Sequence, residues 1–223
     1  MSSTVKQRRR PYDSPLRREQ AAATRRQILE AAQRLFERQG FGATTMNTIA
    51  SAAGVAPKTV YLAFETKSGV LRALWNLRIR AGSEEVPIAE QPWYREVLEA
   101  EEPEQQLWLN ARNSRAAKRR VASVLNVIHA AAPLDADISA LWDRIFTEYH
   151  ANQRVVVESL AEKKALRPGL DLDQATDILW TINHPHIWQL LVRERGWSPE
   201  QYEQWTGDVA CSQLLKSKRR ASS

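Results

Sequence analysis

The chain has 223 residues, 43% hydrophobic and 26% charged, an ordinary balance for a globular protein that excludes a disordered polymer. At about 150 residues per domain, this length allows one or two compact units. Eight glycines and ten prolines are too few for a loop-rich sandwich or barrel, so an all-α fold is expected. The single cysteine, Cys211, cannot close an intramolecular disulfide. Neither a signal peptide nor a run of about 18 apolar residues is visible, so a soluble, cytoplasmic protein is expected.

The formal net charge of +6 is unevenly distributed along the chain. Residues 1–80 hold 15 Lys and Arg against 5 Asp and Glu, whereas residues 81–223 hold 17 against 21. The cationic first third indicates an anionic partner, either nucleic acid or a membrane surface. The mildly acidic remainder contains seven of the eight tryptophans, and the other, Trp75, lies just before it, so this part must serve another purpose.

The first residues of the chain are rich in arginine and poor in apolar side chains, so residues 1–20 are predicted to be a flexible basic arm. Within it, Ser14 and Pro15 could begin a helix, as a cap followed by a first-turn proline. From Thr24 the spacing of apolar residues predicts a helix that Gly40 stops. Its buried face would consist of Ile28, Leu29, Ala32, Leu35 and Phe36.

Two very short helices are predicted next. Thr45 can cap the first and Gly54 can end it, while Pro57 suits the first turn of the second. Two such helices joined by a three-residue turn with glycine are typical of a helix-turn-helix over residues 45–64. Helices this short are marginal alone, so they need the preceding helix and an apolar helix after Thr66 to cover them.

Residues 81–223 are expected to form a longer helical domain without internal repeats or convincing strands. An acidic stretch over 84–104 comes first. Pro185 interrupts one of the later helices, which predicts a kink or break near Asn183 and His184. The helical candidates lie at 104–131, 135–164, 172–194 and 199–215.

The helix-turn-helix segment lacks acidic residues altogether: no Asp or Glu occurs from Arg38 to Phe64. Helix starts usually attract acids because the helix dipole is positive there. Here the starts at Thr45, Pro57 and Lys67 have none, and Lys58 and Lys67 place positive charge in two of them. This arrangement makes sense if phosphates supply the missing negative charge.

The run from Thr44 to Phe64, followed by Lys67 and an apolar helix, resembles the DNA-binding domain of the TetR family of transcriptional regulators, and the segment Ile28 to Gly40 resembles that family's first helix. The resemblance implies a DNA-binding domain at 21–80 and an effector-binding and dimerisation domain at 81–223. It further implies a homodimer that places one recognition helix per subunit in successive major grooves of a palindromic operator. The chain is therefore expected to be a repressor that a small-molecule effector releases from double-stranded DNA.

The same resemblance assigns roles to individual side chains. Tyr61 and Lys67 match family residues that contact phosphates, and Thr45 matches one that anchors the second helix to the DNA backbone. The side chains expected to face the bases are Lys58, Thr59 and Leu62, with Asn47 as a further candidate. The chain departs from the family pattern at Ala56, Ala63 and Gly69, so base reading could rest on fewer side chains.

An effector pocket is expected among the C-terminal helices, although an aromatic stripe at helical spacing is more often plain core. Metal binding by His184 and His186 with His150 or Cys211 matches no tight zinc pattern, so neither a metal nor a cofactor is predicted. The candidate lining residues are Trp108, Trp142, Phe146, Tyr149, Trp180, Asn183, His184 and Trp188.

Catalysis finds little support, because the sequence has no phosphate-binding glycine loop, nucleophile elbow or metalloprotease His-Glu pair, and no enzyme is predicted. Two alternatives remain open. One is a DNA-binding regulator without a small effector, or one controlled by a protein partner at 84–104. The more distant one is a helical enzyme or membrane-surface binder, although residues 42–64 are too broken for a long amphipathic helix.

Overall fold

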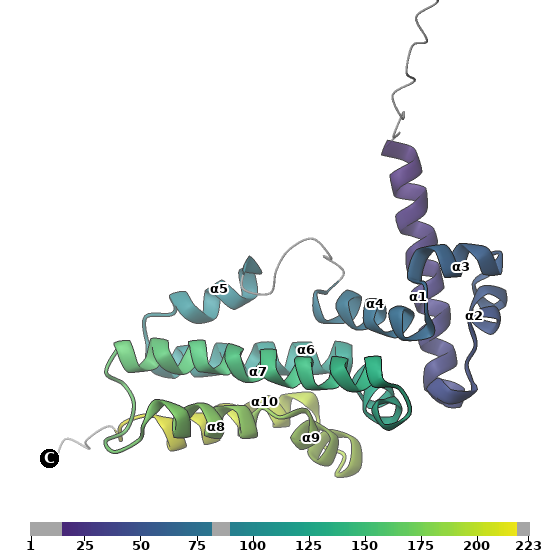
Figure 1. The fold of residues 1–223 in the computed structure, drawn as a ribbon. Helices are drawn as coiled ribbons and strands as arrows, with labels where there is room; N and C mark the ends of the chain where they lie inside the picture. Colours follow the sequence, from purple (N-terminus) through teal and green to yellow (C-terminus); the bar gives the residue numbers. More distant parts are fainter. Residues whose placement is uncertain (1–14, 82–89, 218–223) are drawn as a thin grey trace, which may run out of the picture.

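The computed structural model describes residues 15–81 and 90–217. These residues form an all-α fold, as expected, and the only strand-like pairing among them is an isolated bridge between Leu166 and Leu215. Helices α1 to α3 gather at one end of the molecule, helices α6 to α10 lie in layers at the other, and α4 joins the two groups (Figure 1). In the described part of the chain no helix is long and apolar enough to cross a membrane.

Helix α1 (Pro15–Ala43) begins earlier than the predicted basic arm allows. Residues 15–20 are helical rather than part of a flexible arm, because neither glycine nor proline interrupts the chain between Pro15 and Gly40. The rest of the predicted arm lies outside the described residues. Gly40 breaks the helix as expected, with φ 80° and ψ 167°, and a last turn continues to Ala43.

Helices α2 (Met46–Ala53) and α3 (Pro57–Phe64) form the predicted helix-turn-helix. The Thr45 hydroxyl accepts a hydrogen bond from the Thr48 amide, and the Thr48 hydroxyl accepts one from the Thr45 amide, which makes a reciprocal cap. Gly54 ends α2 in the left-handed conformation, and Pro57 occupies the first turn of α3. Each predicted start and stop of this motif is confirmed.

Helix α4 (Lys67–Ile79) leaves the helix-turn-helix at a point of very close packing. A Cβ placed on Gly69 would lie 2.2 Å from the carbonyl oxygen of Phe64, so only glycine fits there without a shift of backbone. Gly69, one of the departures from the family pattern, thus lies where a side chain has no room. One residue earlier, the Ser68 hydroxyl donates a hydrogen bond of 2.8 Å to Asp135, the residue that caps α7.

The helices of the C-terminal part begin and end close to the predicted positions, with α5 as one additional helix. Helix α5 lies within the acidic stretch 84–104 and was not expected from the sequence, and residues 82–89 of that stretch lie outside the described residues. The predicted break at Asn183 and His184 is confirmed, because α8 ends just before it and α9 starts just after it. The bounds are α5 Pro92–Glu99, α6 Pro103–Ala131, the 3-10 turn η2 Ala132–Leu134, α7 Ala136–Glu162, α8 Leu172–Ile182, α9 Pro185–Trp188, the π-helical turn η3 Gln189–Glu194 and α10 Pro199–Leu214.

The buried apolar side chains form two clusters, and the border between them does not follow the predicted domain boundary at residues 80 and 81. The first cluster runs without interruption from α1 to α4 into α6 and the first half of α7, and includes Leu74, Val121 and Ile145. The second lies at the far end of α6 and α7, where α8 and α10 cover them. The core of the helix-turn-helix is therefore continuous with that of the C-terminal helices.

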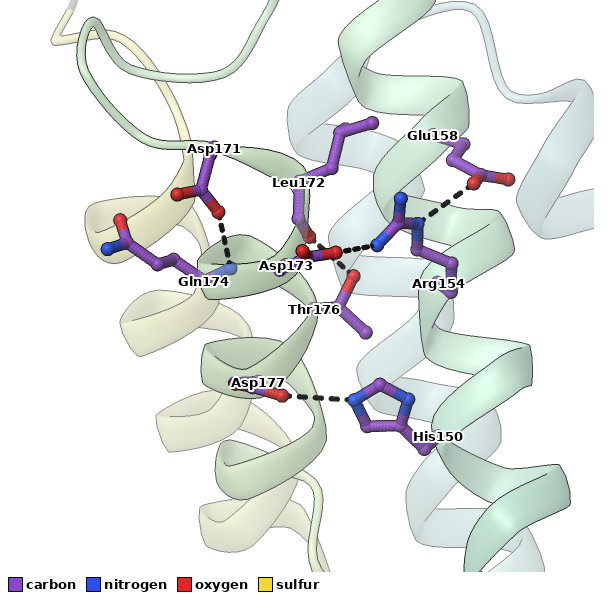
Figure 2. A network of polar contacts seen from close by, with 9 residues as sticks. All are labelled: His150, Arg154, Glu158, Asp171, Leu172, Asp173, Gln174, Thr176 and Asp177. Atoms are coloured by element: carbon purple, nitrogen blue, oxygen red, sulfur yellow. Dashed lines mark hydrogen bonds and ion pairs between the residues drawn. The ribbon is translucent and has the colours of Figure 1, made fainter.

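Polar contacts on the outer surface fix the register between α7 and α8 (Figure 2). Arg154 on α7 binds Glu158 on its own helix and Asp173 on α8, while the His150 ring nitrogen lies 3.0 Å from Asp177. Exposed ion pairs of this kind contribute little to stability, because solvent screens them. They orient α8 on α7, whereas the apolar residues of the second cluster supply most of the stability.

The close approach at Gly69 predicts the effect of a single methyl group. We expect Gly69→Ala to lower the free energy of unfolding by about 1 to 3 kcal/mol, because the added Cβ would force the α3 and α4 backbones apart. Gly42→Ala is the matched control, since a Cβ there meets nothing within 4 Å. Urea unfolding of both variants measures the difference, and equal stabilities would contradict the packing described.

Candidate nucleic-acid interface and internal cavity

Helix α3 turns two side chains into the core and leaves the rest of its surface open. Val60 and Phe64 are buried, whereas Lys58 is exposed, Tyr61 is 48% exposed and Leu62 is 76% exposed. Among the described residues, Leu62 is the most exposed large apolar side chain. The outer face of α3 therefore has the character of a contact surface.

The helix starts beside this face carry no negative charge. Neither α2 nor α3 has an acidic residue in its first turn, and Ala56 provides no side-chain cap for α3. Two of the predicted contact residues, Asn47 and Thr45, are exposed at the start of α2, and Thr59 is half-buried in the first turn of α3. Free amides and positive dipole ends at one surface are suited to anions such as phosphates.

Lys67, one of the predicted phosphate contacts, is held by the protein itself. Its ammonium donates a hydrogen bond of 2.7 Å to the Phe41 carbonyl and lies 4.1 Å from the centre of the Phe41 ring. Burial lowers the pKa of Lys67, and the nearby carboxylate of Asp135 partly opposes that shift. In this structure the side chain secures the end of α1.

Arg25 on α1 secures α3 from the other side, and sequence reasoning missed it. Its guanidinium donates a hydrogen bond of 2.9 Å to the Ala63 carbonyl and lies 4.3 Å from the centre of the Phe64 ring. The bond binds one of the last carbonyls of α3 with positive charge, which is favourable at a helix C-terminus. The acceptor is a backbone atom 38 residues away, so no spacing rule would have revealed the pair.

A cavity of about 140 Å³ lies where α4, α6 and α7 meet. Of the predicted pocket residues, Phe146 and Tyr149 line it. Sequence reasoning missed the contribution of α4 and α6, which comes from the apolar stripes that also form the first core cluster. The apolar part of the lining comprises Trp75, Ile79, Ala117, Val121, Leu125, Ile145, Phe146 and Pro185.

The remaining predicted pocket residues do not line this cavity. Trp108 packs so closely on Gly207 of α10 that a Cβ there would lie 2.6 Å from its ring. Trp188 is buried against Tyr202, with ring centres 5.0 Å apart. The other four form an aromatic group or support it. The rings of Trp142 and Phe146 are tilted at 57° with centres 4.5 Å apart, Trp180 and His184 meet edge to face, and the main-chain carbonyl of Asn183 accepts a hydrogen bond from the Tyr149 hydroxyl.

Lys118 on α6 is the most unusual residue at the cavity. Only 4% of it is exposed, and its ammonium donates a hydrogen bond to the Ser114 hydroxyl. The rings of Tyr149 and Tyr202 lie 5.8 and 5.5 Å from the ammonium. Burial without a carboxylate partner lowers the pKa of Lys118 to about 7. Lys118 lies two helical turns after the buried Ala111 and on the same face of α6. Its burial could therefore have been inferred from the helical spacing of the sequence.

The histidines near the helix break do not form a metal site. Within residues 15–81 and 90–217, no three His, Cys, Asp or Glu side chains are grouped so that they could hold a metal ion. The His184 ring accepts a hydrogen bond from the His186 amide. Burial, followed by the charges of His186 and Lys118, lowers the pKa of His184 to about 4, so this imidazole is neutral at physiological pH.

The match to known sequences falls on this same helix-turn-helix. The family model described as bacterial regulatory proteins, tetR family, matches residues 28–74, which run from the buried face of α1 through α2 and α3 into α4. The helix-turn-helix segment of this chain is therefore of the TetR type. The chain is also 40% identical over 60 residues to the HTH-type transcriptional regulator AcrR of Shigella flexneri, a match that covers 27% of this chain and 28% of AcrR.

Solved structures resemble this chain in fold over a longer part of its length. The SmeT-triclosan complex superposes with a TM-score of 0.69 at 18% sequence identity, covering 87% of this chain and 93% of SmeT. FadR of Bacillus subtilis, solved in complex with stearoyl-CoA, gives a TM-score of 0.67 at 16% identity and covers 84% and 97%. These structures show that the TetR-family fold extends beyond α4 through the C-terminal helices.

The burial of Lys118 predicts how stability depends on pH. Its pKa is lower in the folded chain than in the unfolded chain, so between about pH 7.5 and 9.5 the unfolded state binds more protons and stability rises with pH. The slope from one such group approaches about 1.4 kcal/mol per pH unit. Lys67 and Lys163 are shifted in the same direction, so the wild type must be compared with Lys118→Met.

We expect Lys118→Met to be the more stable protein at about pH 7.5, because folding of the wild type at this pH requires Lys118 to give up a proton that it keeps in the unfolded chain, and its advantage to shrink as the pH rises. Urea unfolding across this range measures the two curves. Parallel curves would show that Lys118 is not shifted.

Proposed function

We propose that this chain is a homodimeric transcriptional repressor that binds a palindromic DNA operator through α3 and leaves it when a small molecule occupies the C-terminal domain. The observation that carries the proposal is the open face of α3, where Lys58, Tyr61 and Leu62 project from a helix whose other face is buried. We assign DNA binding to residues 21–80 and effector binding and dimerisation to residues 81–223, with α4 also contributing to the cavity wall. Such a regulator acts in the cytoplasm, where bacterial DNA lies.

The exposed side chains of α3 divide into base readers and backbone contacts. Lys58 donates to guanine in the major groove, and the methyl groups of Thr59 and Leu62 meet thymine methyls. Contact with a thymine methyl would also give the exposed Leu62 side chain the apolar partner it lacks in the free protein. Asn47 at the start of α2 is a further base reader.

Phosphates are bound around this face, at the uncharged helix starts. Thr45 anchors α2 and Tyr61 contacts the strand beside α3. Lys67 reaches a phosphate by exchanging the neutral Phe41 carbonyl for an anionic oxygen, which is the stronger acceptor for an ammonium group.

Effector control is supported by what lines the cavity. Trp75, Asn76 and Ile79 belong to α4, the helix that packs against the close contact with α3, so a molecule in the cavity touches the element that positions the recognition helix. SmeT and FadR, which share the fold, were solved with triclosan and stearoyl-CoA. An effector releases DNA only if it binds the conformation unable to bind DNA more tightly than the competent one.

Base reading by Lys58 is testable with defined duplexes. We expect Lys58→Ala to reduce discrimination between the preferred operator and single base-pair variants by about 1 to 3 kcal/mol. Fluorescence anisotropy on an operator selected from random duplexes measures it. Lys216→Ala, which removes an exposed lysine far from α3, is the control. Equal loss on every sequence would contradict base reading, and no binding to any duplex at low salt would contradict the function itself.

Dimerisation is expected through α8 and α10, which pack side by side over the second core cluster and would form a four-helix interface with a second copy. We expect sedimentation velocity at micromolar concentration to give twice the chain mass of 25.4 kDa. A monomeric mass under these conditions would exclude the proposed assembly.

A further inference from the structure

Lys118 has more hydrogen-bonding capacity than the protein satisfies. A lysine ammonium has three N–H donors, and the Ser114 hydroxyl is the only hydrogen-bond acceptor that the described residues provide. No Asp or Glu in the described part of the chain forms an ion pair with it. The faces of Tyr149 and Tyr202 lie on either side at cation–π distances. These contacts orient the ammonium but leave its charge unneutralised.

The ammonium belongs to the wall of the cavity between α4, α6 and α7. The charged groups of that wall are Lys118, Arg80 and Glu148, of which Glu148 is exposed to solvent. Lys118 is the only one of these three groups that is buried. An isolated buried cation costs several kcal/mol unless an anion joins it.

The apolar part of the wall limits the size of an occupant. The cavity volume is about 140 Å³, which is close to the volume of an apolar cavity known to accommodate benzene, about 150 Å³. The rings of Trp75 and Phe146, together with Ile79 and Ile145, offer apolar contact around this space. A body of one aromatic ring or a short alkyl chain fits, whereas a fused polycyclic molecule does not without rearrangement of α4.

We propose that the molecule received by this cavity is a small monocarboxylic acid, whose carboxylate pairs with the ammonium of Lys118 and whose single ring or short chain lies against Trp75 and Phe146. The proposal rests on the proposed function, since it names the chemical class of the effector. Other groups that face Lys118 are consistent with an acid. Ser114 can donate its hydroxyl hydrogen to the carboxylate, and the neighbouring His184 is neutral and adds no competing charge.

The test compares acids with their neutral amides, which have the same shape. Benzoate and hexanoate, with benzamide and hexanamide as counterparts, are titrated calorimetrically into the full chain. We expect both acids to bind in the millimolar range or tighter, and each amide to bind at least about tenfold more weakly, the loss that corresponds to 1.4 kcal/mol from a charge-assisted hydrogen bond. Equal affinity for acid and amide, or no binding of either acid at millimolar concentration, would overturn the proposal.

Two variants on the same helix assign the effect to Lys118. Lys118→Met keeps the length of the side chain and removes its charge, and we expect it to fold and to lose acid binding by about tenfold or more. Arg119→Met removes one positive charge from the adjacent, exposed position and is expected to bind benzoate as the wild type does. If Lys118→Met bound benzoate with unchanged affinity, the proposed ion pair would be wrong.

A pH series of the wild type gives a readout that requires no mutation. Above about pH 7.5 the free Lys118 is largely neutral and must take up a proton to pair with the acid. We expect benzoate affinity to fall by up to about tenfold from pH 7.5 to 8.5, with proton uptake visible as a dependence of the binding heat on buffer ionisation. A flat profile without proton uptake would count against the pair.

The outcome separates this inference from the proposed function. Operator binding without binding of either acid would leave the DNA-binding regulator intact and reject only the carboxylic acid. Lys118-dependent binding of benzoate by a protein that binds no duplex would reject the regulator and keep the acid site.

Discussion

The burial of α4 on both of its sides is the constraint on which the rest of the structure depends. Its apolar residues, among them Leu71 and Leu74, belong to one continuous cluster that includes the core of the helix-turn-helix and the near halves of α6 and α7. Helices as short as α2 and α3 cannot persist alone, so they take their stability from this shared core. The position of α3 is thereby linked to the packing of the C-terminal helices.

Local chemistry made the helix-turn-helix predictable. Thr45, Gly54 and Pro57 each act within their own turn, through a cap, a left-handed residue and a fixed φ, so the sequence alone indicates where α2 and α3 begin and end. The break before Pro185 has the same local origin. The helix start offered by Ser14 and Pro15 agrees with the first residue of α1, whereas the flexible arm was extended too far, to residue 20, because a high arginine content was taken to indicate flexibility although arginine is a good helix former.

The cavity could not be predicted in the same way. Trp108 and Phe146 look alike in an apolar pattern, but only the packing of α6 against Gly207 and of α7 against α4 decides that the first is buried against α10 and the second lines the cavity. Helix α5 was not predicted, because it lies in an acidic stretch and has only two buried residues, Tyr94 and Val97, too few for a clear apolar pattern. Lys118 lies in the row of buried residues on α6. From the sequence alone, a lysine at such a position indicates only a gap in the apolar pattern, because its neighbours in space are unknown.

The carboxylate of Asp135 restricts how α4 can move. One of its oxygens accepts the Ile138 amide and caps α7, and the other accepts the Ser68 hydroxyl at the start of α4. That end of α4 is thus tethered, while Trp75 and Ile79 toward its other end face the cavity. A displacement at the cavity would tilt α4 about the tether, and Gly69 leaves no room for slippage against Phe64. The exposed face of α3 would then rotate with α4. In a symmetric dimer this rotation would change the distance between the two α3 helices, while each α3 helix kept its own structure.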